Sequence, residues 1–198
     1  MPDVLRSVDL VAERAADLPV RAETARFAEG QAAEDGRLVR AARDGDRAAF
    51  ATLYDRYARV VHGLLMARVS RDEVEDLVQD VFMSAWRRLD DLRDPAAFGG
   101  WVAMIARNRA TDFHRRAADF VELPENLPAR GATGEHAEAR AALDAIRSLP
   151  EAYRDTLVLR LVEGLTGPEI AMRTGLTPAS VRVNLHRGMK LLREKLGR

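Results

Sequence analysis

The chain has 198 residues, and its 31 basic and 31 acidic side chains give a formal net charge of zero at pH 7. Because there is no Cys, a disulfide framework and thiolate metal sites are excluded. No apolar run approaches the roughly eighteen residues that a membrane helix needs, and the charged first ten residues lack the core of a secretory signal, so we expect a cytoplasmic protein without direct membrane insertion.

Charge is distributed unevenly along the chain. Residues 1–36 and 119–138 are acidic, whereas residues 107–116 and 182–198 are basic. A chain with two separate basic segments can bind DNA at two places and still be neutral overall.

The first 36 residues are rich in Ala, Glu and Arg. Apolar residues recur at helical spacing before Pro19, which predicts an amphipathic helix that ends there, and residues 30–36 are interpreted as a flexible lead-in. A mobile tail and a docking helix for a partner both fit this segment.

Two amphipathic helices are predicted from Leu38 onward. Asp46 is a candidate N-cap of the first, while Ser70 and Glu73 have the spacing of a capping box for the second. Helical spacing predicts that both contribute an apolar stripe to one core. The stripe residues are Phe50, Leu53, Tyr54, Tyr57, Val60, Val61, Leu64, Leu65, Val74, Leu77, Val78, Val81, Phe82, Ala85, Trp86 and Leu89.

The second of these helices carries a polar face opposite its stripe. Acidic groups in the middle of a helix gain nothing from its dipole, which leaves them available to a protein partner with a basic surface. This face consists of Glu75, Asp76, Gln79, Asp80 and Arg87.

A third helix is predicted after the polar loop of residues 90–94, with Asp94 and Pro95 as its caps. Positive side chains near its C-terminus suit the helix dipole. Asn and Arg beside aromatic residues also suit single-stranded DNA, whose bases stack and whose phosphates attract cations. The polar cluster late in this helix is Asn108, Arg109, Asp112, Arg115 and Arg116.

Residues 118–138 contain Pro and Gly and show no sustained period, which indicates a flexible linker. About twenty extended residues reach some 65 Å, and one turn of DNA spans about 35 Å. Such a linker would allow two modules to hold DNA sites nearly two turns apart.

The last segment has the pattern of a helix-turn-helix. Two helices, from residue 139 and from Pro150, are expected to support it. Thr166 and Glu169 form a capping box, Gly175 supplies the turn, and Thr177 begins the second helix. That helix buries Val181, Leu185, Gly188 and Leu192, and presents Arg182, His186, Arg187 and Lys190, which suits the major groove of DNA.

No strand pattern appears, so the sequence predicts an all-α protein of two small helical domains. The expected parts are an N-terminal extension at 1–36, a first domain at 37–117, the linker at 118–138 and a second domain at 139–198.

The chain resembles a bacterial RNA polymerase sigma factor of the extracytoplasmic-function (ECF) group. Order, spacing and residue types agree in three motifs: EDLVQDVFMSAWRRL (75–89), FGGWVAMIARNRATDFHRR (98–116) and LPEAYRDTLVLRLVEGLTGPEIAMRTGLTPASVRVNLHRGMKLLREKL (149–196). The resemblance implies an alternative sigma factor that is not an enzyme, with no cofactor or metal. Its implied partners are the β′ clamp helices and β flap of core RNA polymerase, promoter DNA and an anti-sigma factor.

The resemblance also implies roles for particular residues. The clamp-binding surface would be Glu75, Asp76, Gln79 and Asp80. The −10 element would be melted and read by Asn108, Arg109, Asp112, Arg115 and Arg116, with residues 90–97 as the pocket for a flipped base. The −35 element would be read by Ser180, Arg182, Val183, Arg187 and Lys190.

Two residues depart from the family pattern. Asn184 and Met189 stand where many members carry a basic residue, which is expected to weaken phosphate attraction.

Two other functions remain as alternatives. A helix-turn-helix regulator would share the second domain but would bind duplex DNA without being a polymerase subunit. An enzyme with a DNA-targeting tail would need a nucleophile with a base or a metal-binding cluster. Neither is evident, because the serines have no His partner and the four His residues are scattered.

Overall fold

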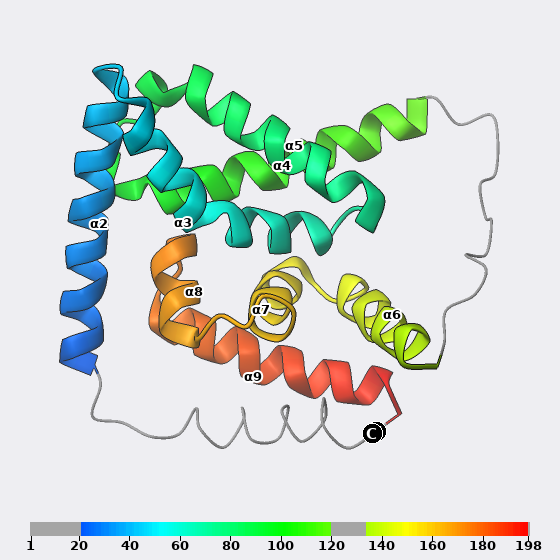
Figure 1. Ribbon diagram of the computed structural model, residues 1–198. Coiled ribbons are helices and arrows are strands. Elements are labelled where there is room, and N and C mark those ends of the chain that lie inside the picture. Colours follow the sequence, from blue (N-terminus) through cyan, green and yellow to red (C-terminus); the bar gives the residue numbers. More distant parts are fainter. Residues whose placement is uncertain (1–20, 120–133, 198) are drawn as a thin grey trace.

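The structure is a computed structural model that describes residues 21–119 and 134–197. Within these ranges the chain forms α-helices and short 3-10 turns without a β-strand, which confirms the predicted all-α class (Figure 1). The predicted helix before Pro19 and most of the predicted linker lie outside the described residues. The elements in chain order are α2 (Arg21–Arg43), α3 (Arg47–Met66), α4 (Arg71–Arg87), η2 (Leu89–Asp91), η3 (Pro95–Ala97), α5 (Phe98–Asp119), α6 (Gly134–Arg147), α7 (Glu151–Leu161), α8 (Gly167–Thr174) and α9 (Pro178–Lys195).

The first half of the molecule is a helical bundle of α2 to α5 around one apolar core. Its buried stripe includes Leu53, Val61, Val81 and Val102, each fully or almost fully buried. Asp46 caps α3 as predicted, because its carboxylate accepts from the amides of residues 48 and 49. This bundle supplies the rigid base from which the polar faces of α4 and α5 project.

Helix α2 corrects the prediction of a flexible lead-in. Gly30 and Gly36 both lie inside this helix, which packs along α3 and η3. Its anchor is Asp35, a buried carboxylate that accepts hydrogen bonds from the hydroxyl of Tyr57 and from the guanidinium of Arg56. Long-range packing therefore overrides the local cost of two glycines in a helix.

At two predicted helix starts, the capping in the structure differs from the predicted capping. Ser70 is the N-cap of α4, but its side chain makes no cap hydrogen bond, so the predicted capping box with Glu73 is wrong. Asp94 accepts from the amide of Ala96 and caps η3 rather than α5, which follows directly at Phe98.

The second half consists of α6 to α9 around a smaller core. Ile146, Leu157, Val158 and Leu192 are buried together there. Gly188 allows α9 to approach α7 closely, since a Cβ at this position would lie 3.1 Å from atoms of Leu157 and Tyr153. The two supporting helices predicted beneath the helix-turn-helix are present as α6 and α7.

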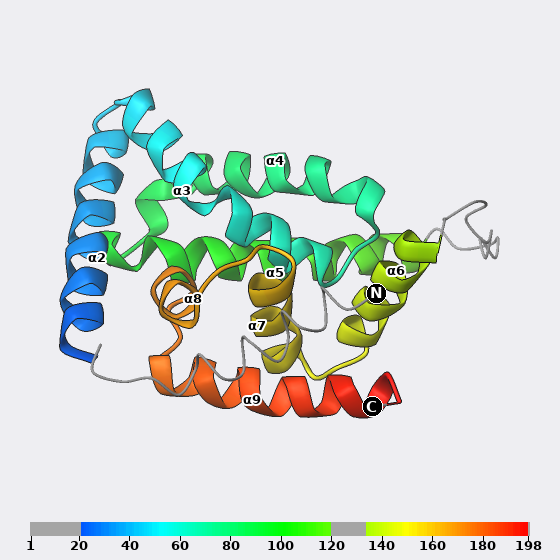
Figure 2. The same cartoon turned by 60° about the horizontal axis from the view of Figure 1, so that its bottom comes forward.

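The two halves pack directly against each other. Residues of α7, α8 and α9 join the core of the first half, among them Leu159, Ile170 and Val181. Gly63 of α3 and Gly99 of α5 lie at this junction, where added Cβ atoms would stand 2.8 Å from Glu163 and from the carbonyl oxygen of Arg173. In both views α7 lies between α5 on one side and α9 on the other (Figures 1 and 2).

Candidate nucleic-acid and protein interfaces

The helix-turn-helix has the local geometry that its sequence predicts. The Thr166 hydroxyl accepts from the amide of Glu169, and the Glu169 carboxylate accepts in return from the amide of Thr166 at 2.8 Å. This backbone hydrogen bond is the main reason that the pKa of Glu169 is lowered. Gly175 ends α8 with a left-handed φ of 74°, and Thr177 caps α9 through the amide of Ser180.

Helix α9 presents the predicted reading residues to solvent. Its buried side includes Val181, Gly188 and Leu192, with Leu185 half-buried. The opposite side carries a set of exposed residues, among them Val183, which is 43% exposed. The exposed set includes every predicted −35 reader: Ser180, Arg182, Val183, Arg187 and Lys190.

Met189 corrects one expectation about this helix. Its side chain is buried in the second core with Leu192 and Leu157. The side chain at this position therefore does not face DNA phosphates, and the expected weakening of phosphate attraction does not apply to it. The apolar stripe of α9 is therefore wider than the predicted one. Asn184, the other departure from the family pattern, is half-buried.

The second half of α5 presents the predicted −10 residues as one polar patch. Asn108, Arg115 and Arg116 are exposed, and Asp112 pairs with Arg115 at 3.0 Å. Arg109 lies 3.7 Å from Asp80 of α4. The patch thus combines amide and guanidinium donors with a backbone that is held by the underlying core.

Met104 belongs to this patch although the sequence reasoning missed it. It precedes Asn108 by one helical turn and leaves 47% of its surface exposed. Its position four residues before Asn108 was the available signal, because residues at this spacing share a helix face. An exposed apolar side chain beside hydrogen-bonding groups is suited to contact with a base.

The loop of residues 90–97 is fixed from the side of α2. The guanidinium of Arg43 donates to the carbonyl oxygen of Leu89 at 2.8 Å and also to that of Leu92. Leu89 and Leu92 are buried, while Asp90 and the following polar residues remain exposed. The loop is therefore a preformed element whose exposed side adjoins the start of α5.

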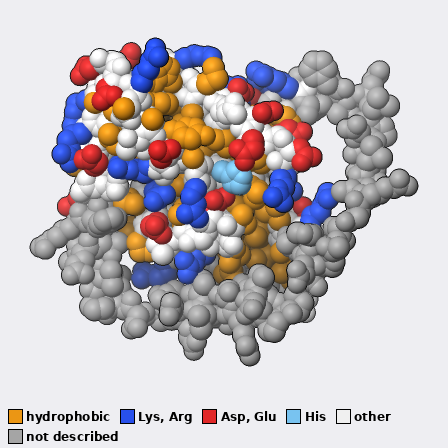
Figure 3. Space-filling model, viewed as in Figure 1, with side chains coloured by type: hydrophobic (Ala, Val, Ile, Leu, Met, Phe, Trp, Pro, Cys, Tyr) orange, Lys and Arg blue, Asp and Glu red, His pale blue; other side chains and the backbone are white. Residues whose placement is uncertain are grey.

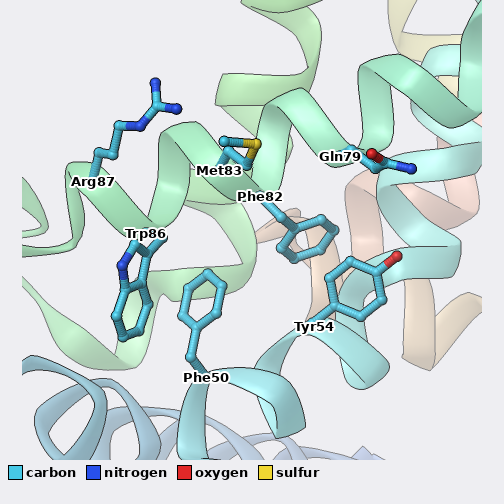
Figure 4. A pocket seen from close by; sticks show the side chains of 7 residues that line it. All are labelled: Phe50, Tyr54, Gln79, Phe82, Met83, Trp86 and Arg87. Atoms are coloured by element: carbon cyan, nitrogen blue, oxygen red, sulfur yellow. The ribbon is translucent and has the colours of Figure 1, made fainter. Parts of the chain in front are cut away.

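The acidic face of α4 borders an apolar groove. Glu75, Asp76, Gln79 and Asp80 are all exposed. The groove lies between α3 and α4 and has a volume of about 350 Å³ (Figure 4). Its lining consists of Phe50, Tyr54, Gln79, Phe82, Met83, Trp86 and Arg87.

Two aromatic residues of this groove that were predicted to be core are exposed. Tyr54 and Trp86 are 38% and 39% exposed, and Met83, which lies outside the predicted stripe, is 52% exposed. Edge contacts hold the rings in place, with centroids 4.8 Å apart for Phe50 and Trp86. In the space-filling view, hydrophobic and acidic side chains adjoin on the face formed by α3 and α4 (Figure 3).

The two patches predicted to contact DNA lie on different helices, α5 and α9. The patch on α5 and the reading side of α9 belong to helices on either side of α7 (Figure 2).

In the described ranges, His, Asp and Glu residues form no group of three or more that could hold a metal ion. Among these same residues, no helix has the length and apolar character required to cross a membrane.

Comparison with protein families gives two matches that follow the two halves. The family model for sigma-70 region 2 matches residues 53–120, and that for sigma-70 region 4 matches residues 139–192. The match over the first half disfavours a helix-turn-helix regulator that acts without polymerase.

Curated proteins and solved structures agree with these matches. The chain is 35% identical over 162 residues to the RNA polymerase sigma factor CarQ of Myxococcus xanthus, covering 78% of this chain and 93% of CarQ. It is 31% identical over 180 residues to the ECF RNA polymerase sigma-E factor of Haemophilus influenzae, covering 82% and 95% of the two chains. The structure of CnrH, solved with the cytosolic domain of CnrY, matches with a TM-score of 0.58 at 25% identity, covering 83% of this chain and 97% of CnrH.

Proposed function

We propose a division of labour for this chain, which belongs to the ECF group of RNA polymerase sigma factors. The chain binds core RNA polymerase in the cytoplasm through α4, opens and reads the −10 element through α5, and reads the −35 element through α9. The polymerase performs the chemistry, and the sigma factor supplies promoter selection. One observation carries the proposal: the acidic face of α4 and the polar patch of α5 are adjacent, joined by Asp80 and Arg109.

The polymerase contact combines charge with apolar burial. Asp76, Gln79 and Asp80 would meet basic residues of the β′ clamp helices, while the groove beside Gln79 would receive an apolar side chain. An interface of this kind derives specificity from charge pairs and affinity from a few buried aromatic anchors. Tyr54 and Trp86 are the anchors available on this face.

The −10 contact requires unpaired bases to be held. Unstacking a base costs a few kcal/mol, so an opened strand must be stabilised by stacking, hydrogen bonds and phosphate contacts. Asn108 and Asp112 offer hydrogen-bonding groups, and Arg115 and Arg116 offer cations. The preformed loop of residues 90–97 would accept a flipped base.

The −35 contact is a duplex contact in the major groove. The N-terminal part of α9 enters the groove, with Ser180 and Arg182 on base edges and with Arg187 and Lys190 on phosphates. The β flap of polymerase is the expected contact of this half when DNA is bound. CnrH was solved with a bound protein domain, and by analogy we propose that an anti-sigma factor holds this chain inactive.

The direct test is association with core RNA polymerase of the host bacterium. Asp80→Lys reverses a charge at the centre of the proposed contact and is expected to weaken binding at least tenfold, or about 1.4 kcal/mol. Asp44→Lys is the matched control, because Asp44 is also an exposed carboxylate and lies in the turn between α2 and α3. Equal affinities of both variants and the unmodified protein would refute the assignment of the α4 face.

A further inference from the structure

A cluster of four charges lies where the two halves meet. Arg68, just after α3, points Nη1 at Asp155 Oδ1 and Nη2 at Glu151 Oε1, both at 2.6 Å. Arg107 of α5 reaches the other oxygen of Asp155, with Nε 2.9 Å from Oδ2. Each arginine comes from the first half, and both carboxylates come from α7.

These side chains are buried to different degrees. The Arg68 and Asp155 side chains are only 8% and 5% exposed, whereas Glu151 is 58% exposed. The hydrogen bond from Arg68 lowers the pKa of Glu151, which keeps that carboxylate charged. Burying such pairs adds little net stability, because desolvation offsets the attraction.

The two acids present their oxygens to the arginines much as phosphodiester groups would. Guanidinium groups bind carboxylate and phosphate oxygens with the same forked geometry. Arg68 donates from its two Nη atoms to two separate carboxylates, those of Asp155 and Glu151. Arg107 donates to the carboxylate of Asp155 as well. The site is thus built to hold anionic oxygens that are currently supplied by the protein itself.

The arginine pair also adjoins the −10 patch. Arg107 directly precedes Asn108 on α5. The imidazole of His114, which directly precedes Arg115 on the same helix, donates from Nε2 to the carbonyl oxygen of Arg68 at 2.9 Å. Arg68 is therefore tied to α5 independently of its contacts with α7.

We propose that Arg68 and Arg107 form a binding site for the phosphates of single-stranded promoter DNA, which Glu151 and Asp155 occupy in the free protein. This inference rests on the proposed role of α5 in −10 recognition. When the second half moves away from the first, the two arginines lose their carboxylates and extend the cationic surface beside Asn108. Helix α7 acts in the free protein as a mimic of the DNA backbone.

The junction contains a matched control for this proposal. Glu163 also crosses it, accepting from Nδ1 of His62 at 2.7 Å and lying 3.7 Å from Arg59. It touches neither Arg68 nor Arg107. A change at Glu163 therefore removes a polar contact of the same junction, while Glu151 and Asp155 still pair with the two arginines.

The test is binding of a fluorescent single-stranded −10 oligonucleotide to the full chain over a salt series. The double variant Glu151→Gln with Asp155→Asn is expected to bind about tenfold more tightly at low salt. The plot of log K against log salt should steepen by about 1.4, the value for two additional single-strand phosphates. Glu163→Gln is expected to leave the slope unchanged, and adding Arg107→Gln to the double variant should remove about half of the added slope.

Several outcomes would overturn the inference. A gain from Glu163→Gln or from the double variant that persists when Arg107→Gln is added would show that binding improves without the proposed site. No gain in the double variant would show that the arginines do not meet DNA. Glu151→Gln alone, on an exposed side chain, provides a second variant if the double variant does not fold, and a slope equal to that of the unmodified chain would also count against the site.

Core-dependent transcription by the unmodified chain separates this inference from the proposed function. If the chain directs transcription but the oligonucleotide results are negative, only the phosphate site fails. If the chain directs no transcription with core polymerase, the proposed function itself fails.

Discussion

Asp80 of α4 lies 3.7 Å from Arg109 of α5, and this pair joins the face proposed for polymerase to the patch proposed for the −10 element. Both side chains are partly exposed, so the pair itself contributes at most about 1 kcal/mol to stability. The pair marks where the two surfaces meet. They are fixed relative to each other because α4 and α5 are neighbouring helices of one bundle. If α4 binds polymerase as proposed, this arrangement would hold α5 at a defined position relative to the polymerase.

Substitutions at the two ends of this pair are expected to have different effects. Arg109→Gln should leave the affinity for core polymerase within about twofold, because a lost exposed pair costs little. It should reduce strand opening at the −10 element, measured as permanganate reactivity of unpaired thymines. Asp80→Asn should weaken core binding instead, and a core-binding defect in Arg109→Gln would argue against this separation.

Close packing of the two halves makes Gly63 sensitive to substitution. A Cβ at Gly63 would lie 2.8 Å from Cγ of Glu163 and 3.0 Å from Cδ2 of Leu159. Gly63→Ala is therefore expected to lower the free energy of unfolding by about 1–3 kcal/mol through overpacking. Gly30→Ala is the control, since nothing lies within 4 Å and Ala favours a helix by up to about 1 kcal/mol. Urea denaturation of both variants would measure these changes in the free energy of unfolding, which are expected to have opposite signs.

The junction between the halves is expected to respond to pH through His62. The hydrogen bond to Glu163 is the largest cause that raises the pKa of His62 above its ordinary value of about 6.5. A raised folded-state pKa stabilises the protein fully below about pH 6.5, and this contribution is lost as pH rises through the folded-state value.

The measurement is the difference in unfolding free energy between the unmodified protein and His62→Gln across this pH range. The difference should be largest at acidic pH and should shrink as the pH increases. His186→Gln, on the exposed face of α9, serves as the reference. A difference that grows with pH would contradict the assigned direction.

Two N-cap residues that both carry a hydroxyl are expected to contribute differently to the free energy of unfolding. The Thr166 hydroxyl accepts from the amide of Glu169, whereas the Ser70 side chain makes no cap hydrogen bond. Thr166→Ala should lower the free energy of unfolding by about 1 kcal/mol, and Ser70→Ala should cost much less. Equal losses in chemical denaturation would show that the Ser70 hydroxyl caps α4 in solution.

Features that depend on a few neighbouring residues were predictable from the sequence. The caps at Asp46, Thr166 and Thr177 and the left-handed Gly175 follow from local chemistry, and all four are present. The exposed faces of α4, α5 and α9 were also predictable, because helical spacing decides which residues share a side.

Features that depend on distant segments were not predictable in this way. Arg68 and Asp155 are 87 positions apart in the chain, and no local pattern pairs them. Gly30 lies in a helix because α2 packs on the bundle, and Met189 is buried because the second core covers a wider strip of α9 than the spacing suggested. The partial exposure of Trp86 likewise reflects a groove that only the packed pair α3 and α4 creates.

Run-off transcription with core polymerase on a promoter library separates the proposed −35 contact of α9 from the proposed −10 contact of α5. Arg182→Ala is expected to change the recovered −35 sequences while opening at the −10 element remains efficient. Asn108→Ala is expected to preserve −35 selection and to impair opening. If Arg182→Ala impairs opening and Asn108→Ala alters −35 selection, the assignment of the two DNA contacts to α9 and α5 is contradicted.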